Sequence, residues 1–236
     1  RRRCAKAIVD RMGLYAPAQP IQGFIYGGFG VDDLPEDRSK HIALTTSLLP
    51  AEYPRLLPVV DSPEDILDAV AQGIDLFSNS YPGRLAELGH AFTFAINNFD
   101  ATATDSHAAS SSDQPMPPNP LPFVPAEMGG DRNKICLKDP FYELDKTPLL
   151  QGCTCYTCTK HTRAYIHHLI NTHEMLATIL LVIHNTHHYL AFFNEIRKSI
   201  AADQFPTYQS QFVEATNALC KLPRPADCII YRNPAN

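Results

Sequence analysis

The sequence lacks an excess of positive charge and lacks any long uninterrupted apolar run. Its 236 residues contain 20 Lys and Arg against 25 Asp and Glu, which gives a formal net charge of −5 and a sequence pI of about 6.0. Because neutralising phosphates requires a basic face, this balance argues against a free-standing RNA-binding protein. The longest apolar run, Met175 to Ile183, contains Thr178 and is far shorter than the ~20 residues of a membrane span.

A signal peptide and a regular disulfide framework are also lacking. The basic start, Arg1 to Arg3, leads into a segment that is too short and too broken for the apolar core of a signal peptide. The seven cysteines are odd in number, and four are scattered and predicted to be free thiols: Cys4, Cys136, Cys220 and Cys228. These features predict a reducing compartment. Because the sequence starts without methionine, we expect it to be a fragment or a partial gene model.

The other three cysteines fall within six residues, at Cys153, Cys155 and Cys158. This spacing is too tight for disulfide partners and is typical of a metal site, because Zn²⁺ binds thiolates and imidazoles in a tetrahedron of four protein ligands. A fourth ligand must come from elsewhere, and seven of the ten histidines lie between positions 161 and 188. The residues alone leave four candidates: His161, His167 and His168, directly after the thiols, and His184, on a later predicted helix.

These cysteines and histidines have two alternative interpretations. The thiols could be free and partly buried, with the histidines lining a helix. His184 and His188 are four residues apart, which suits a catalytic zinc pair, but Asn185 stands where the His-Glu-x-x-His arrangement needs its general base. Three thiolates and one imidazole would leave no open position for water. The predicted metal therefore stabilises the fold and performs no chemistry.

Short apolar segments alternate with helical patterns in the first hundred residues. The predicted strands lie in 21–26, which runs into a glycine-rich turn, in 54–60 and in 74–77, and helical patterns cover 1–14, 42–49 and 62–73. The last helix has Ser62 as its cap and Pro63 at its first position. This alternation predicts parallel β/α units, from either a doubly wound sheet or a β/α barrel. The length suits one large domain or two small ones.

The composition changes after residue 100. Residues 101–130 contain a serine run, six prolines and a glycine pair, a composition that cannot bury a core and predicts a disordered insert. Three helices are predicted after it, over 159–171, 174–201 and 205–220. The predicted organisation is β/α units over 1–100, the insert over 101–130, a metal-binding subdomain with C-terminal helices over 131–220, and a loose tail over 221–236.

Three motifs together resemble one known family. They are the Cys-x-Cys-x-x-Cys of 153–158, the Thr-Arg-Ala-Tyr-x-His-His-Leu of 162–169 and the Ile-His-Asn of 183–185. This set resembles the zinc subdomain of the tRNA-guanine (queuine) transglycosylases. The resemblance implies that His184 is the fourth zinc ligand. It also implies the fold, which is the C-terminal part of an irregular (β/α)8 barrel with an inserted zinc subdomain, beginning in mid-barrel.

The family's nucleophile is replaced in this sequence. Family members exchange guanine at the tRNA wobble position through a covalent intermediate on an aspartate, and Ser78 occupies that position here. A serine hydroxyl is neutral and weakly nucleophilic without an adjacent base, and it gives no negative charge to an oxocarbenium-like transition state. Asp75 is a poor substitute, since residues 75 and 78 of a regular strand point to opposite faces. We therefore predict a structural or strand-end role for Asp75 and no catalysis by Ser78.

Two further motifs concern contact with the base or the tRNA. The family's Pro-Thr-Arg becomes Pro82-Gly83-Arg84, and Glu87 replaces a second arginine that helps to hold the anticodon loop. A carboxylate near phosphate is repulsive. Arg84 and the glycine pair Gly27 and Gly28, which matches a backbone approach to the base, are the candidates for base or tRNA contact.

The altered nucleophile and the insert resemble the noncatalytic branch of the family. Its members pair with a catalytic subunit, which implies a heterodimer that replaces guanine by queuine at position 34 of tRNAs with GUN anticodons. The candidate dimer contacts are His161, Tyr165 and His168. The resemblance further implies a cytoplasmic location or a peripheral one on the mitochondrial outer membrane. Alternatives are an active transglycosylase with another nucleophile and a stand-alone zinc-dependent binding module.

Overall fold

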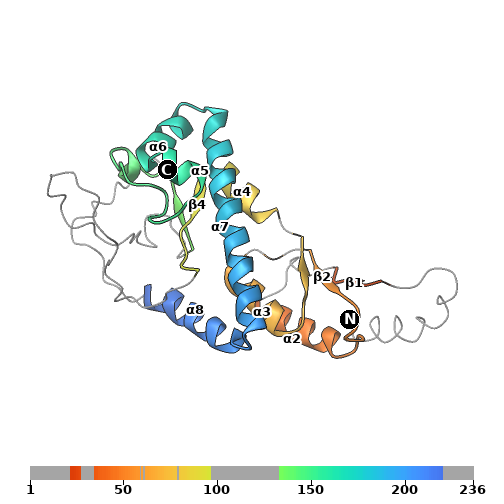
Figure 1. The fold of residues 1–236 in the computed structure, drawn as a ribbon. Coiled ribbons are helices and arrows are strands. Elements are labelled where there is room, and N and C mark those ends of the chain that lie inside the picture. Colours follow the sequence, from red (N-terminus) through yellow and green to blue (C-terminus); the bar gives the residue numbers. More distant parts are fainter. Residues whose placement is uncertain are drawn as a thin grey trace. The chain divides into compact units, whose positions relative to one another are not determined.

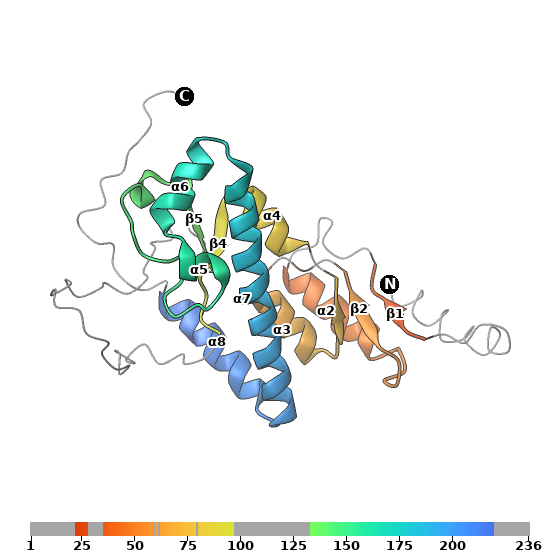
Figure 2. The same cartoon turned by 45° about the horizontal axis from the view of Figure 1, so that its top comes forward.

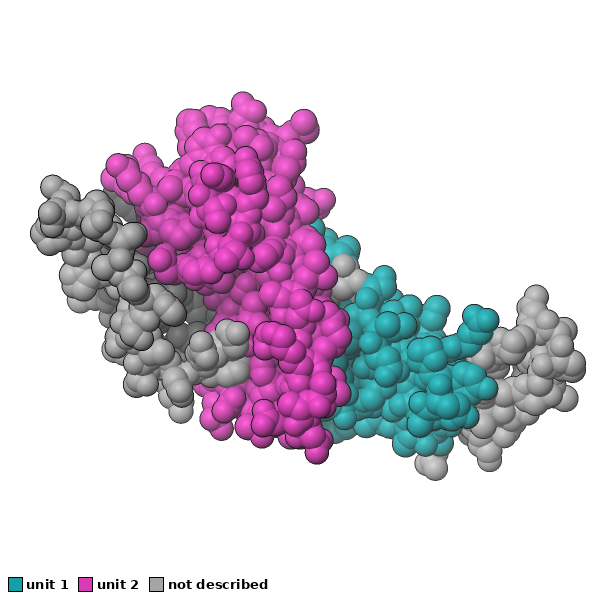
Figure 3. Space-filling model, viewed as in Figure 1, with its two compact units in different colours: residues 1–84 teal, residues 85–236 magenta. Residues whose placement is uncertain are grey.

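The computed structural model describes residues 22–27, 35–58, 60, 62–78, 80–96 and 133–219. The predicted helix over 1–14, the insert over 101–130, the tail over 221–236 and Gly28 lie outside these residues. The chain divides into two compact units, residues 1–84 and residues 85–236 (Figure 3).

The first unit is a parallel β/α arrangement (Figure 1). Its elements in chain order are β1 (Phe24–Ile25), α2 (Pro35–Thr46), β2 (Arg55–Leu57), α3 (Pro63–Ala71) and β3 (Leu76–Phe77). The three strands form one sheet in the order β1-β2-β3, and both strand pairs are parallel. The prediction of parallel β/α units is therefore confirmed for this part of the chain.

Helix α3 begins where its sequence signals predict. The Ser62 side chain accepts the backbone N–H of Asp65 at 3.0 Å, and Pro63 occupies the first turn. Ile66 and Leu67 are fully buried along its inner face. The helix ends before Gly73, whose φ of +85° lies in the left-handed region that a glycine adopts without strain.

Strand β2 is shorter than the predicted segment 54–60. Prolines at 54 and 58 flank its three residues, and proline has no N–H to donate to a ladder. Arg55 is buried at 8% exposure, and its guanidinium donates hydrogen bonds to backbone carbonyls of residues 46, 49, 50 and 73. This side chain ties the turn after α2 to the turn after α3.

The second unit contains an antiparallel pair that the sequence pattern did not predict. Strand β4 (His90–Phe92) pairs with β5 (Lys134–Cys136), with Ala91 opposite Ile135. Helix α4 (Tyr81–Glu87) leads into β4, and the 3-10 helix η2 (Pro140–Tyr142) follows β5. The sequence pattern grouped residues 90–92 with the β/α units, whereas in the structure they pair with the segment that precedes the thiols.

Four helices complete the described part of this unit: α5 (Tyr156–Lys160), α6 (Arg163–Asn171), α7 (Met175–Ala201) and α8 (Phe205–Leu219). The prediction of one helix over 159–171 is wrong. His161 is extended, with φ −134° and ψ 155°, and Thr162 caps a new helix by accepting the N–H of Tyr165. The predicted helices 174–201 and 205–220 match α7 and α8 to within a residue at each end.

Helix α7 is the central element of the second unit. It contacts β4, α5, α6 and α8, and Figure 2 shows it running alongside β4. Leu180 and Leu181 are buried on α7 and belong to one apolar cluster with Ala91, Ile135 and Ile166. Among the described residues, α7 is the one helix that is long and apolar enough to cross a membrane, and 44% of its most apolar 18-residue stretch is buried inside the protein.

Candidate metal centre

The three thiols are held by a short loop and the first turn of α5. Cys155 is the N-cap of α5, and its Sγ accepts the backbone N–H of Cys158 at 3.3 Å. Thr157 is fully buried and donates its hydroxyl to the carbonyl of Leu180 on α7 at 2.7 Å. This bond holds α5 against α7, from which the fourth ligand comes.

His184 lies within α7 and brings its Nδ1 to the thiols. The distances from Nδ1 to the Sγ atoms of Cys153, Cys155 and Cys158 are 3.8, 3.5 and 3.3 Å. All four atoms lie within 4.8 Å of one another. A tetrahedral zinc ion with ordinary bond lengths requires sulfur–nitrogen separations of about 3.6 Å. The three nitrogen–sulfur distances therefore suit one four-coordinate metal ion held by these four side chains.

The second ring nitrogen of His184 is fixed by the strand. Its Nε2 donates to the carbonyl oxygen of Phe92 at 2.9 Å, and the residue is fully buried. This hydrogen bond selects the tautomer in which Nδ1 carries a lone pair that can bind a metal. Strand β4 therefore orients the nitrogen ligand.

The electrostatics of the cluster favour a cation among the thiols. Hydrogen bonding with Cys158 lowers the pKa of Cys153 to about 3 and raises the pKa of Cys158. Burial by itself lowers the pKa of His184, but hydrogen bonds with Cys153 and Cys155 raise it to about 9. The metal-free ring is therefore protonated at neutral pH, and a metal ion bound by the thiolates would displace the proton from Nδ1.

His188 does not join the cluster. Its Nε2 donates to the carbonyl of Phe94 at 3.0 Å, and burial lowers its pKa to about 4, so the ring is neutral. The reading of His184 and His188 as a catalytic zinc pair is therefore wrong. One helical turn further on, His188 instead makes the same kind of bond to the segment that follows β4.

The other candidate histidines lie elsewhere. His167 is buried, with Nδ1 2.8 Å from the carbonyl oxygen of Leu137 and Nε2 2.8 Å from the amide nitrogen of Asn171. His168 is exposed on α6, and the ring of His161 stacks on that of Tyr165. Of the four histidines that the sequence left open, His184 is the one that meets the thiols.

Two aromatic rings, one on α5 and one on α6, contact His161, which lies between these helices. The His161 and Tyr165 rings stack at 5.1 Å, and the Tyr156 ring meets His161 edge-on at 5.6 Å. Tyr156 is 57% exposed and Tyr165 is 38% exposed. Tyr156 was missed from the sequence, although its place inside the thiol motif, next to Cys155, fixes it close to His161.

Ser78 follows β3 and is exposed. Among the described residues it has no hydrogen-bond partner that would act as a base. A carboxylate oxygen of Asp75 accepts the backbone N–H of Arg55 at 2.9 Å, which is the structural role predicted for this residue. Nothing in the described part of the chain therefore activates Ser78 as a nucleophile.

Two of the three candidates for base or tRNA contact are described. A Cβ atom added at Gly27 would meet nothing within 4 Å, so the space around this position does not require glycine. Arg84 lies on α4, with its guanidinium carbon 5.9 Å from the centre of the Tyr81 ring. Neither position is tested further by the structure.

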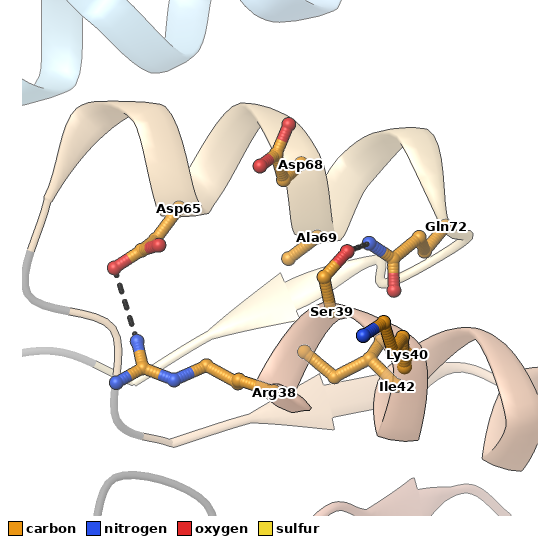
Figure 4. Close-up of a pocket in the computed structure, with 8 residues that line it drawn as sticks. All are labelled: Arg38, Ser39, Lys40, Ile42, Asp65, Asp68, Ala69 and Gln72. Carbon is orange, nitrogen blue, oxygen red and sulfur yellow. Dashed lines mark hydrogen bonds and ion pairs between the residues drawn. The ribbon is translucent and has the colours of Figure 1, made fainter. Parts of the chain in front are cut away.

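A surface hollow between α2 and α3 is lined by both helices (Figure 4). Two polar links cross it, from Arg38 to Asp65 at 3.0 Å and from Gln72 to the Ser39 hydroxyl at 2.7 Å. These contacts join the two helices. The lining contains none of the residues that the sequence singled out for metal, base or dimer contact.

Comparison with known proteins gives one consistent match. A family model described as queuine tRNA-ribosyltransferase matches residues 1–218. A protein of Danio rerio is 36% identical over 197 residues, and one of Homo sapiens is 35% identical over 195 residues. One of Drosophila virilis is 38% identical over 196 residues. All three are named queuine tRNA-ribosyltransferase accessory subunit 2.

The matches cover most of this chain but not of the relatives. The aligned regions take up 81%, 79% and 80% of this chain and 47%, 46% and 40% of the three relatives in the same order. The chain therefore spans about half the length of the curated relatives it matches.

Removing the imidazole should abolish tight metal binding. In the His184→Ala variant the site keeps three thiols but loses its fourth ligand and its bond to strand β4, so we expect the purified protein to lose most of its bound metal. Elemental analysis by mass spectrometry, normalised to protein, measures this. The exposed neighbour His187 provides the control, because His187→Ala should retain the wild-type metal content. Equal metal content in both variants would contradict the ligand assignment.

Proposed function

The chain belongs to the queuine tRNA-ribosyltransferase family, and on that premise we propose that it acts as part of a noncatalytic accessory subunit of this enzyme. Its partner is a catalytic subunit, and together they exchange guanine for queuine at the wobble position of tRNAs with GUN anticodons. The observation that carries the proposal is Ser78 at the family's nucleophile position. It is a neutral hydroxyl, and among the described residues no base contacts it.

The rival reading as an active transglycosylase requires another nucleophile. Asp75 is the nearest carboxylate along the strand, but it is engaged by the backbone N–H of Arg55. Glu87 adds negative charge close in sequence to Arg84, which disfavours binding of a phosphate backbone. These features support an accessory role over independent catalysis.

We propose Zn²⁺ as the ion of the metal centre. Three sulfur donors and one imidazole are a ligand set that suits Zn²⁺. The nitrogen–sulfur separations match those of a tetrahedral site. Such a set leaves no ligand position for water. When bound, the ion supplies cross-links between the thiol loop and α7, and no chemical step is assigned to it.

We also propose that the first unit is a segment of an irregular (β/α)8 barrel. Leu57 and Tyr26 are buried on one face of its parallel sheet. The strand register places Leu56 between Ile25 and Leu76, and this second apolar row is open, with Ile25 71% and Leu76 52% exposed. Parallel sheets are normally covered on both faces. Further strands of a longer protein would cover this row as they close a barrel.

The proposed contact with the catalytic subunit includes His161, Tyr165 and His168. Exposed aromatic side chains are enriched at protein interfaces. The stacked rings of His161 and Tyr165, with Tyr156 beside them, form such a surface next to the metal centre. The proposal extends to base or tRNA contact at Gly27, Gly28 and Arg84, and to a location in the cytoplasm or on the surface of mitochondria.

Base exchange should require both subunits. We expect the full-length protein alone to incorporate no labelled guanine or queuine into tRNA, and the mixture with its catalytic paralogue to be active, with a maximum at a one-to-one ratio. The Ser78→Ala variant should support the mixture as well as wild type does, because the hydroxyl attacks nothing. Incorporation by the protein alone, or its loss with Ser78→Ala in the mixture, would contradict the accessory role.

Tyr165 should contribute to subunit association. Truncating an exposed aromatic side chain at an interface commonly costs about 1–2 kcal/mol, so Tyr165→Ala should weaken the heterodimer roughly tenfold. Analytical ultracentrifugation or interferometry with the catalytic subunit measures this. Met175 is 80% exposed at the start of α7, and Met175→Ala serves as the control. An unchanged dissociation constant for Tyr165→Ala would remove this residue from the interface.

A further inference from the structure

Strand β4 pairs with β5 along one edge, and among the described residues no strand lies along its other edge. Toward β5, the N–H of Thr93 donates to the carbonyl of Asn133 at 3.0 Å, and the carbonyl of Gly89 accepts from Leu137 at 2.9 Å. Because successive backbone groups of a strand alternate in direction, the groups of residues 90, 92 and 94 point to the opposite edge. An unpaired buried edge is unfavourable, so these groups need partners.

Asn185 of α7 supplies two of these partners. Its Oδ1 accepts the backbone N–H of Phe92 at 2.9 Å, and its Nδ2 donates to the carbonyl of His90 at 3.0 Å. Asn185 is fully buried. A side-chain amide is suited to this position because it offers a donor and an acceptor side by side, as a neighbouring strand would.

His184 and His188 supply partners for two more of these groups. They donate to the carbonyls of Phe92 and Phe94 at 2.9 and 3.0 Å. One helical turn of four residues rises roughly 6 Å, and two strand residues span roughly 6.7 Å, so the two histidines match the two carbonyls. Side chains of helix α7 thus make the hydrogen bonds that a third strand would make along the other edge of β4.

Both backbone groups of Phe92 are used, and they connect the metal ligand to Asn185. The carbonyl of Phe92 orients His184, while the N–H of Phe92 is held by Asn185. A shift of this strand residue would therefore disturb both contacts at once. The side chain of Phe92 adds to the constraint, since its ring stacks on that of Tyr189 at 5.8 Å.

We propose that Asn185 is a positioning residue of the metal centre, which holds Phe92 so that its carbonyl keeps the His184 ring aimed at the three thiolates. This inference rests on the proposed zinc centre. Removing a hydrogen-bonding partner behind a metal ligand typically weakens metal binding 10- to 100-fold. We expect a loss in this range when Asn185 is truncated.

The test compares metal binding by the full-length wild-type protein and its Asn185→Ala variant. Zn²⁺ affinity is measured by competition with a chromogenic chelator under reducing conditions, and the visible bands of the Co²⁺-substituted protein report ligand geometry. We expect the Zn²⁺ dissociation constant of Asn185→Ala to rise 10- to 100-fold and its Co²⁺ bands to shift. Equal affinity and an identical Co²⁺ spectrum would overturn the proposal.

A control separates positioning from general destabilisation. Phe192 lies two turns further along α7, is fully buried and packs its ring on Phe94 at 5.3 Å. Phe192→Leu should lower the unfolding temperature but leave the Zn²⁺ affinity and the Co²⁺ spectrum unchanged. If it weakens metal binding as much as Asn185→Ala does, the role of Asn185 is only structural. A wild-type protein that binds no Zn²⁺ would instead overturn the metal centre itself.

A second measurement needs no variant. Since coupling between two sites is reciprocal, removing Zn²⁺ from the wild-type protein should release Phe92. Hydrogen exchange should then speed up at the Phe92 amide more than at the Thr93 amide, which donates to β5. Unchanged exchange at Phe92, or an equal increase at both amides, would overturn the link.

Discussion

The imidazole of His184 is the contact on which the second unit depends. One of its nitrogens lies 3.3–3.8 Å from three thiols, and the other lies 2.9 Å from the carbonyl of Phe92. A ring in this position joins a loop, a helix and a strand that are far apart in sequence. Because it is fully buried, each of these polar partners is needed to offset its desolvation. The metal centre and the strand pairing therefore form one network.

The two units differ in how completely they keep the residues that the family's sites need. In the second unit the ligands are complete and supported by neighbouring groups, as in a centre that stabilises a fold. In the first unit the position of the family's nucleophile is an exposed serine, and Asp75 serves the backbone of Arg55. This contrast is what the proposed accessory role rests on.

Local signals predicted much of this structure. The cap at Ser62 predicted the start of one helix, and the apolar pattern of α7 predicted another. The thiol spacing predicted three of the metal ligands, and the family resemblance supplied the fourth, His184. The pairing of β4 with β5 was missed because the strands have three residues each and lie some forty residues apart, so no local period marks them. The break at His161 was missed because a single threonine caps α6, and the helical spacing of polar and apolar residues continues across it. The role of Asn185 requires the strand edge, which the sequence alone does not reveal.

X-ray absorption at the zinc edge of the purified full-length protein tests the central claim most directly. The account predicts three sulfur neighbours at about 2.3 Å and one nitrogen neighbour at about 2.0 Å, with imidazole scattering beyond the first shell. A closed centre of this kind is what links the thiol loop to His184 and, through it, to strand β4. An oxygen neighbour from water, a shell of four sulfurs or the absence of imidazole scattering would contradict it.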